Sequence, residues 1–173
     1  MDNHPKVDDG VTLRLLSIEV RPQRFGFVVL DGTRLLEWGV RGCQPAGESL
    51  GIVAGKRLDA VIDLYRPALV LIRKRSLKLS PRAQSGSAAI TEAIRSRCGH
   101  RSTELRWIAA ETVRAFFADQ GAATKHAVAS LLAEWFEELI WKVPPKRKPW
   151  QSERYNTLMF DALATAIAFL GRT

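Results

Sequence analysis

The chain has 173 residues, 46% hydrophobic and 25% charged, which suits one globular domain with a sizeable core. Its formal net charge of +8 at pH 7 favours a polyanionic partner, of which nucleic acid is the commonest. Two distant cysteines and three scattered histidines support neither a disulfide framework nor a zinc site.

Membrane insertion and export are not expected. The apolar runs are shorter than the roughly 18 residues that a membrane span needs. The first ten residues are polar and show no signal peptide. We therefore expect a soluble, cytoplasmic protein with no membrane partner and no evident small-molecule substrate.

The expected organisation is a flexible tail at residues 1–10 and a single domain over residues 11–173, with a basic loop near residues 142–152. The domain opens with an aliphatic run, residues 13–18, that predicts a mostly buried strand. This strand runs directly into Glu19. A carboxylate at the end of a core strand is costly to desolvate without a partner such as a cation, so Glu19 is a candidate site residue.

Two more strands complete an antiparallel start. Pro22 predicts a turn, residues 25–30 predict the second strand, and residues 33–40 predict the third. The pair Asp31-Gly32 between the last two is a strong hairpin signal.

A helix and a buried strand follow. Apolar residues at helical spacing predict a helix over residues 50–65, which Arg66-Pro67 ends. Residues 68–72 are continuously apolar and predict a strand buried on both faces. Because it follows a helix directly, we expect it to lie parallel to the first strand.

The composition then becomes strongly basic. Residues 73–82 carry cations and no acid, and residues 83–87 predict a flexible segment of small residues. The remaining predicted elements are a helix at 88–97, a strand at 104–108, a short helix at 112–117, a long helix from the cap Thr124 to 141, a basic loop at 143–152 and a last helix at 152–170.

One apolar face of the predicted long helix is either core or a dimer surface. It consists of Val128, Leu131, Leu132, Trp135, Phe136 and Leu139. Taken together, the elements predict an α/β fold with a mixed five-stranded sheet, three antiparallel strands followed by parallel ones, flanked by helices.

Five stretches in this order match one family pattern: residues 16–19, 25–29, 65–72, 112–125 and 161–166. Together they resemble the RuvC family of Holliday-junction resolvases, within the RNase H-like superfamily. The resemblance covers most of residues 13–170. It implies a DNA partner, in particular branched DNA, a homodimer formed through helices, and a role in DNA recombination and repair.

The resemblance also implies a metal-dependent endodeoxyribonuclease centre. In the family, acids from the first strand, the fourth strand and the last helix bind two Mg²⁺ (or Mn²⁺) ions that activate water and stabilise the leaving oxygen. The corresponding metal ligands and catalytic acids here are Glu19 and Asp161. Lys125 stands where a catalytic basic residue serves the scissile phosphate. Arg73 and Leu158 stand where two further acids are expected.

The cation at position 73 leaves two readings open. Two unit charges about 4 Å apart interact by roughly 4 kcal/mol at an effective dielectric constant of 20, so Arg73 would repel a metal ion. Arg73 then pairs with Glu19 or Asp161 and occupies the place of the cation, with no cofactor. Alternatively, Glu111 or Glu92 supplies a replacement ligand and the centre stays active.

The expected nucleic-acid contacts are basic side chains from three parts of the chain. They are Arg73, Lys74, Arg75, Lys78, Arg82, Arg114, Lys125, Lys146, Arg147 and Lys148. Trp141 and Trp150 near the last three are candidates to stack on a base. Each of three site residues also has an alternative interpretation without a function. Glu19 would lie at a solvated strand end, Asp161 would cap or pair on a helix, and Lys125 would be an ordinary lysine in the first turn of a helix.

Three functions follow from these readings. The first is a RuvC-like protein that holds branched or duplex DNA through a basic surface and has a degenerate nuclease centre. The second is an active Mg²⁺-dependent Holliday-junction endonuclease. The third is a structural or interaction subunit of a larger nucleic-acid machine.

Overall fold

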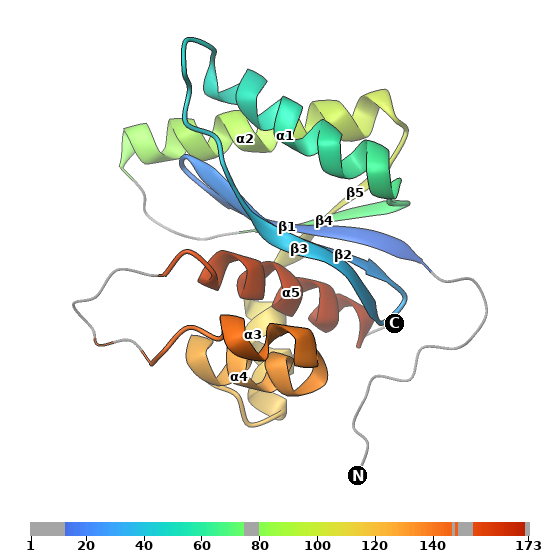
Figure 1. Ribbon diagram of the computed structural model, residues 1–173, viewed down its shortest axis with the longest axis vertical. Coiled ribbons are helices and arrows are strands. Elements are labelled where there is room, and N and C mark those ends of the chain that lie inside the picture. The colour runs from blue at the N-terminus through green and yellow to red at the C-terminus, as the bar shows by residue number, and fades with distance from the viewer. Residues whose placement is uncertain (1–12, 75–79, 147, 149–153, 172–173) are drawn as a thin grey trace.

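The computed structural model describes residues 13–74, 80–146, 148 and 154–171 (Figure 1). The predicted tail at residues 1–10 lies outside the described residues, as do four predicted nucleic-acid contacts. These four are Arg75, Lys78, Arg147 and Trp150.

The core of the fold is a five-stranded sheet in the order β3-β2-β1-β4-β5. Its strands are β1 (Arg14–Arg21), β2 (Arg24–Asp31), β3 (Arg34–Gly42), β4 (Leu69–Lys74) and β5 (Glu104–Ala109). The first three pair antiparallel, and β4 and β5 continue parallel to β1. The predicted fold class and the parallel crossover are therefore confirmed.

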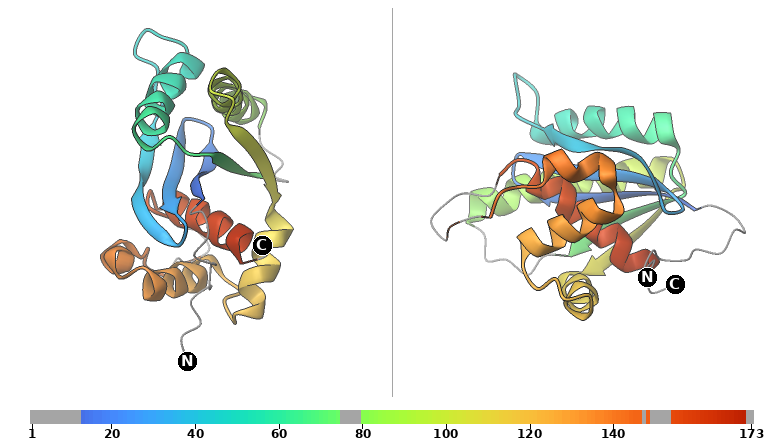
Figure 2. Two further views of the ribbon diagram at one scale, coloured as in Figure 1. Left: turned by 90° about the vertical axis from the view of Figure 1, so that its right-hand side faces the viewer. Right: turned by 60° about the horizontal axis from the view of Figure 1, so that its bottom comes forward.

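Helices cover both faces of the sheet (Figures 1 and 2). On one face lie α1 (Leu50–Tyr65) and α2 (Pro81–His100), which pack against each other. On the other face lies α5 (Thr157–Leu170), with α3 (Ala110–Asp119) and α4 (Lys125–Trp135) packed on its outer side. Since α5 is enclosed between the sheet and two helices, nearly all of its residues are buried.

Strand β1 divides its side chains between the two faces, because successive residues of a strand point to opposite sides. Leu16 and Ile18 join the core under α1 and α2, whereas Leu15 joins the core under α5. Ser17 also faces α5, since its hydroxyl donates a 2.7 Å hydrogen bond to the carbonyl of Ala162. The same alternation turns Glu19 toward α5.

The segment before α2 differs from the prediction. The helix begins at Pro81 and not at residue 88, so the predicted flexible segment at residues 83–87 is wrong. The Ser80 hydroxyl accepts from the backbone N–H of Ala83, and Pro81 at the first helical position fixes a helical φ. Gly86 then lies directly against the carbonyl of Pro22 in the β1–β2 turn, where a Cβ would come within 2.3 Å of the oxygen.

The predicted long helix is also interrupted. The Thr124 hydroxyl caps α4 as expected, accepting from the N–H of Ala127 at 3.1 Å. The helix ends at Phe136, whose backbone is not helical, and the chain continues as the 3₁₀ helix η1 (Glu137–Lys142). This break buries Phe136 and Leu139 in the core, and the rest of the apolar face packs there too. The last helix begins at Thr157, later than predicted.

No helix within the described ranges is long and apolar enough to cross a membrane.

Candidate functional site

The site lies where β1 and β4 meet the first turns of α5. Glu19 is fully buried, and its strand partner on β2 is Gly26. A Cβ at Gly26 would come within 2.4 Å of the carbonyl carbon of Leu158, so the missing side chain lets α5 approach the sheet closely. Asp161 follows one helical turn after Leu158 and is thereby brought to Glu19.

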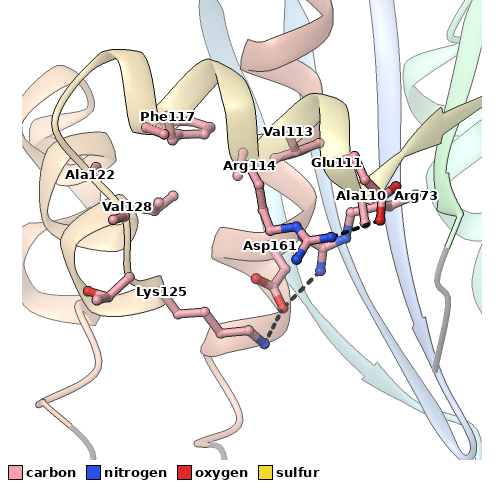
Figure 3. A pocket seen from close by; sticks show the side chains of 14 residues that line it. Arg73, Ala110, Glu111, Val113, Arg114, Phe117, Ala122, Lys125, Val128 and Asp161 are labelled. Atoms are coloured by element: carbon pink, nitrogen blue, oxygen red, sulfur yellow. Dashed lines mark hydrogen bonds and ion pairs between the residues drawn. The ribbon is translucent and has the colours of Figure 1, made fainter. Parts of the chain in front are cut away.

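Arg73 joins the two acids. The register Ile18↔Ile72 between parallel β1 and β4 puts the next residue of each strand, Glu19 and Arg73, side by side. The Nε of Arg73 lies 2.9 Å from Oε2 of Glu19, and its Nη2 lies 3.2 Å from Oδ2 of Asp161. One guanidinium therefore bridges the acid of the first strand and the acid of the last helix. Figure 3 shows its contact with Asp161.

A second arginine reinforces the bridge. β1 continues two residues beyond Glu19, so Arg21 lies on the same face of the strand. Its Nη1 contacts Oε1 of Glu19, and its Nη2 lies 3.4 Å from Oδ2 of Asp161. The turn predicted at Pro22 was expected to begin before Arg21, so this role was missed. The signal was the spacing of two residues after Glu19, which an extended strand would have made meaningful.

Lys125 is the third cation of the cluster. It is the first residue of α4, and its Nζ lies 3.1 Å from Oδ2 of Asp161 (Figure 3). About half of its side chain is exposed, whereas the side chain of Asp161 is only 8% exposed. The cluster thus sets the carboxylates of Glu19 and Asp161 against three cations, which leaves an excess of positive charge.

Burial and ion pairing act on these groups in opposite directions. Desolvation has the largest effect on Glu19 and raises the pKa of its carboxyl. The positive charge of Arg73 opposes this rise, and the negative charge of Asp161 adds to it. Burial alone would lower the pKa of Arg73, but the charges of Asp161 and Glu19 outweigh it and raise that pKa. Arg73 is therefore held firmly as a cation between the acids.

A cavity of about 420 Å³ opens beside the cluster. Arg73, Lys125 and Asp161 line one side of it, and Glu111 and Arg114 of α3 line another (Figure 3). Arg114 donates a 2.7 Å hydrogen bond to Glu111. The pKa of the Glu111 carboxyl is lowered, first by a hydrogen bond to the backbone of Glu111 itself and second by the hydrogen bond from Arg114. Glu111 is therefore a carboxylate already paired with its own cation.

The residues present do not fit a two-metal centre. Among the described residues, no group of three or more histidine, cysteine or acidic side chains is arranged to hold a metal ion. Two divalent ions need several acids, and here Arg73 and Arg21 already contact the oxygens of Glu19 and Asp161. Leu158, at the second expected helix acid, is buried against the sheet.

Of the two suggested replacement ligands, Glu92 is excluded by its place in the fold. It is an exposed residue of α2, on the face of the sheet opposite α5, and pairs with Arg95. Glu111 does lie on the cavity wall.

The other predicted nucleic-acid contacts that the structure describes are dispersed. Arg114 lies on the cavity wall, and Lys146 lines a neighbouring cavity together with Lys125. Lys74 is exposed at the end of β4 and Lys148 is exposed beyond η1. Arg82 instead lies in the first turn of α2, beside the β1–β2 turn.

Comparison with known proteins gives matches at the level of structure. No protein-family model matches the chain, and no curated protein matches it in sequence. Thermus thermophilus RuvC in complex with a Holliday junction substrate superposes with a TM-score of 0.67 at 16% identity, covering 92% of this chain and 93% of that one. The yeast mitochondrial Holliday junction resolvase superposes with a TM-score of 0.71 at 12% identity, covering 95% and 81%.

A viral protein extends the same likeness. The fowlpox virus resolvase, solved with Holliday junction DNA, gives a TM-score of 0.57 at 10% identity, covering 92% of this chain and 99% of that one. These matches span nearly the whole sheet and its helices, which is the likeness expected from the sequence. The chain therefore has the RuvC-like form of the RNase H fold.

Proposed function

We propose that the chain is a RuvC-like DNA-binding protein that holds branched or duplex DNA through the cationic cavity beside Glu19 and Asp161. In this proposal the former nuclease centre is a salt-bridged cluster that works without a metal cofactor. The observation that carries the proposal is the Arg73 guanidinium, which contacts both acids from the position of the missing strand acid.

Electrostatics supports the metal-free reading. A buried cation that already contacts both carboxylates stabilises them, and a divalent ion would have to displace it against a repulsion of several kcal/mol. Arg73 cannot be neutralised to make room, because the acids raise its pKa further.

The charge of the chain supports the choice of DNA. A formal net charge of +8 favours a polyanion, and the local excess of cations at the cavity matches a phosphate group. The structural neighbours add to this, because two of them were solved with Holliday junction substrate or DNA. A homodimer remains part of the proposal, and light scattering of the purified protein measures it directly.

Electrophoretic binding of a four-way junction, a duplex and a single strand over a salt series tests the proposal. We expect binding that falls steeply with salt, because it rests on phosphate contacts, and that does not change when EDTA replaces Mg²⁺. Lys146→Glu should weaken it, while Lys56→Glu, on an exposed lysine of α1, serves as the matched control. Absence of binding at low salt would refute the proposal and favour a structural or interaction subunit instead.

An active endonuclease is the second candidate, because Glu111 lines the same cavity as Asp161. Cleavage of the junction with Mg²⁺ or Mn²⁺, lost in Asp161→Asn and in Glu111→Gln, would establish it. Under the main proposal, neither metal supports cleavage by the unmodified protein.

A further inference from the structure

A second cavity adjoins the cationic one. It has a volume of about 330 Å³ and lies between the start of α4, the segment after η1 and the start of α5. The two cavities share Lys125 and Asp161 as lining residues, so these side chains stand at the boundary between them. Both volumes lie within the range of small-ligand pockets, roughly 300 to 1,000 Å³.

The two cavities differ in chemistry. The first is bordered by the cations Arg73, Arg114 and Lys125. The second has apolar walls from Pro144, Pro145 and Phe160 and polar groups from Thr157 and His126, and the cations Lys125 and Lys146 also line it. A cationic compartment suits a phosphate, and an apolar compartment with a few hydrogen-bonding groups suits a flat heterocycle.

Two polar groups at the second cavity are oriented by hydrogen bonds. His126 Nδ1 lies 2.9 Å from the carbonyl of Pro144, so Nδ1 must donate, and Nε2 is the ring atom left for a ligand. At Asp161, the three cations of the cluster all contact Oδ2. Within the part of the chain that the structure describes, Oδ1 has no hydrogen-bond partner and is left to accept from an amino group.

We propose that the two cavities together form a site for one unpaired nucleotide, with its phosphate at the cationic cavity and its base in the second. This inference rests on the proposed DNA binding and specifies which form of DNA the protein prefers. A base inside a duplex is stacked and cannot enter a cavity, whereas an unpaired base at a bulge or branch point is available. The protein should therefore prefer DNA with an unpaired base over continuous duplex.

Three oligonucleotide duplexes of equal length test the site: one fully paired, one with a single-nucleotide bulge, and one whose bulge is abasic. We expect the unmodified protein to bind the bulged duplex about tenfold more tightly than the other two, because only that duplex supplies a base. 2-Aminopurine at the bulge should change its fluorescence on binding. Equal affinity for the abasic and base-containing bulges would overturn the inference.

Matched variants locate the effect. Thr157→Phe fills the second cavity from a half-buried position and should abolish the preference for the bulge while leaving binding of paired duplex unchanged. Thr103→Phe makes the same change at a half-buried threonine lining a cavity beside Arg66 and Arg101, and should keep the preference. A preference that survives Thr157→Phe overturns the inference with DNA binding intact, whereas binding of none of the duplexes overturns the proposed function as well.

Discussion

Arg73 and Glu19 lie side by side on neighbouring parallel strands and form a buried ion pair, with Nε 2.9 Å from Oε2. Glu19 is fully buried and the side chain of Arg73 is 12% exposed. Removing one partner of a buried pair is costly because the other charge stays desolvated, and without Arg73 the cation of the cluster still in contact with Glu19 would be Arg21. The stability of the folded domain therefore depends on the positive charge of Arg73, whether or not a ligand is bound.

Arg73→Ala should lower the free energy of unfolding by about 3 to 5 kcal/mol, because it strips Glu19 and Asp161 of a shared partner. Urea denaturation followed by circular dichroism measures the loss. Arg95→Ala is the matched control, since Arg95 forms an exposed pair with Glu92 and should cost no more than about 1 kcal/mol. Equal effects of the two substitutions would contradict the structural role of Arg73.

Arg73→Asp should create a metal requirement. The substitution adds a third acid to Glu19 and Asp161 and reverses the excess charge of the cluster, so a divalent ion becomes the group that stabilises it. We expect a variant with a lowered Tm that rises by several degrees with Mg²⁺ or Mn²⁺, because a ligand that binds only the folded state stabilises it. The unmodified protein and Arg95→Asp should show no such rise; a Tm of Arg73→Asp that ignores both ions refutes the prediction.

Glu19 should give the protein an unusual pH response. Its folded-state pKa is raised above the ordinary value of 4.5, chiefly by burial, so the folded state binds a proton more tightly than the unfolded state. The contribution of Glu19 is therefore fully present below pH 4.5 and is lost as the pH rises through the folded-state pKa. Urea unfolding from pH 4 upward should show the unmodified protein losing stability relative to Glu19→Gln. Parallel pH curves for the two proteins would contradict the shift.

The antiparallel start and the parallel crossover could be predicted from the sequence, because each rests on a local signal, whereas the meeting of Glu19 with Asp161 was expected from the resemblance to the RuvC family. Alternating or continuous apolar runs marked the strands, and a helix directly before a buried strand fixed the crossover. The helix boundaries at Pro81 and Phe136 were missed, because they depend on capping by Ser80 and on the burial of Phe136.

The site was harder to predict in its details. Arg21 joins the cluster because β1 continues two residues past Glu19. How far β1 continues depends on its pairing with β2, and this pairing ends at the pair Arg21 and Arg24. Gly26 is important because a helix distant in the sequence packs on it. Gly26 has no local signal, and the spacing of Arg21 after Glu19 becomes informative only once the strand is known to continue, since both relationships are set by tertiary contacts.

Gly26→Ala should test how far the site depends on that close approach. The added Cβ would come within 2.4 Å of the Leu158 carbonyl carbon, so α5 must move from the sheet or the strand must bend. We expect a loss of about 1 to 3 kcal/mol in the free energy of unfolding, typical of overpacking. Gly42→Ala is the matched control in the same sheet, because nothing lies within 4 Å of its added Cβ.

A displaced α5 also separates Asp161 from Arg73, so combining Gly26→Ala with Arg73→Ala should cost less than the sum of the two single changes. Simple additivity in this double-mutant cycle would show that the glycine contact and the ion cluster are independent.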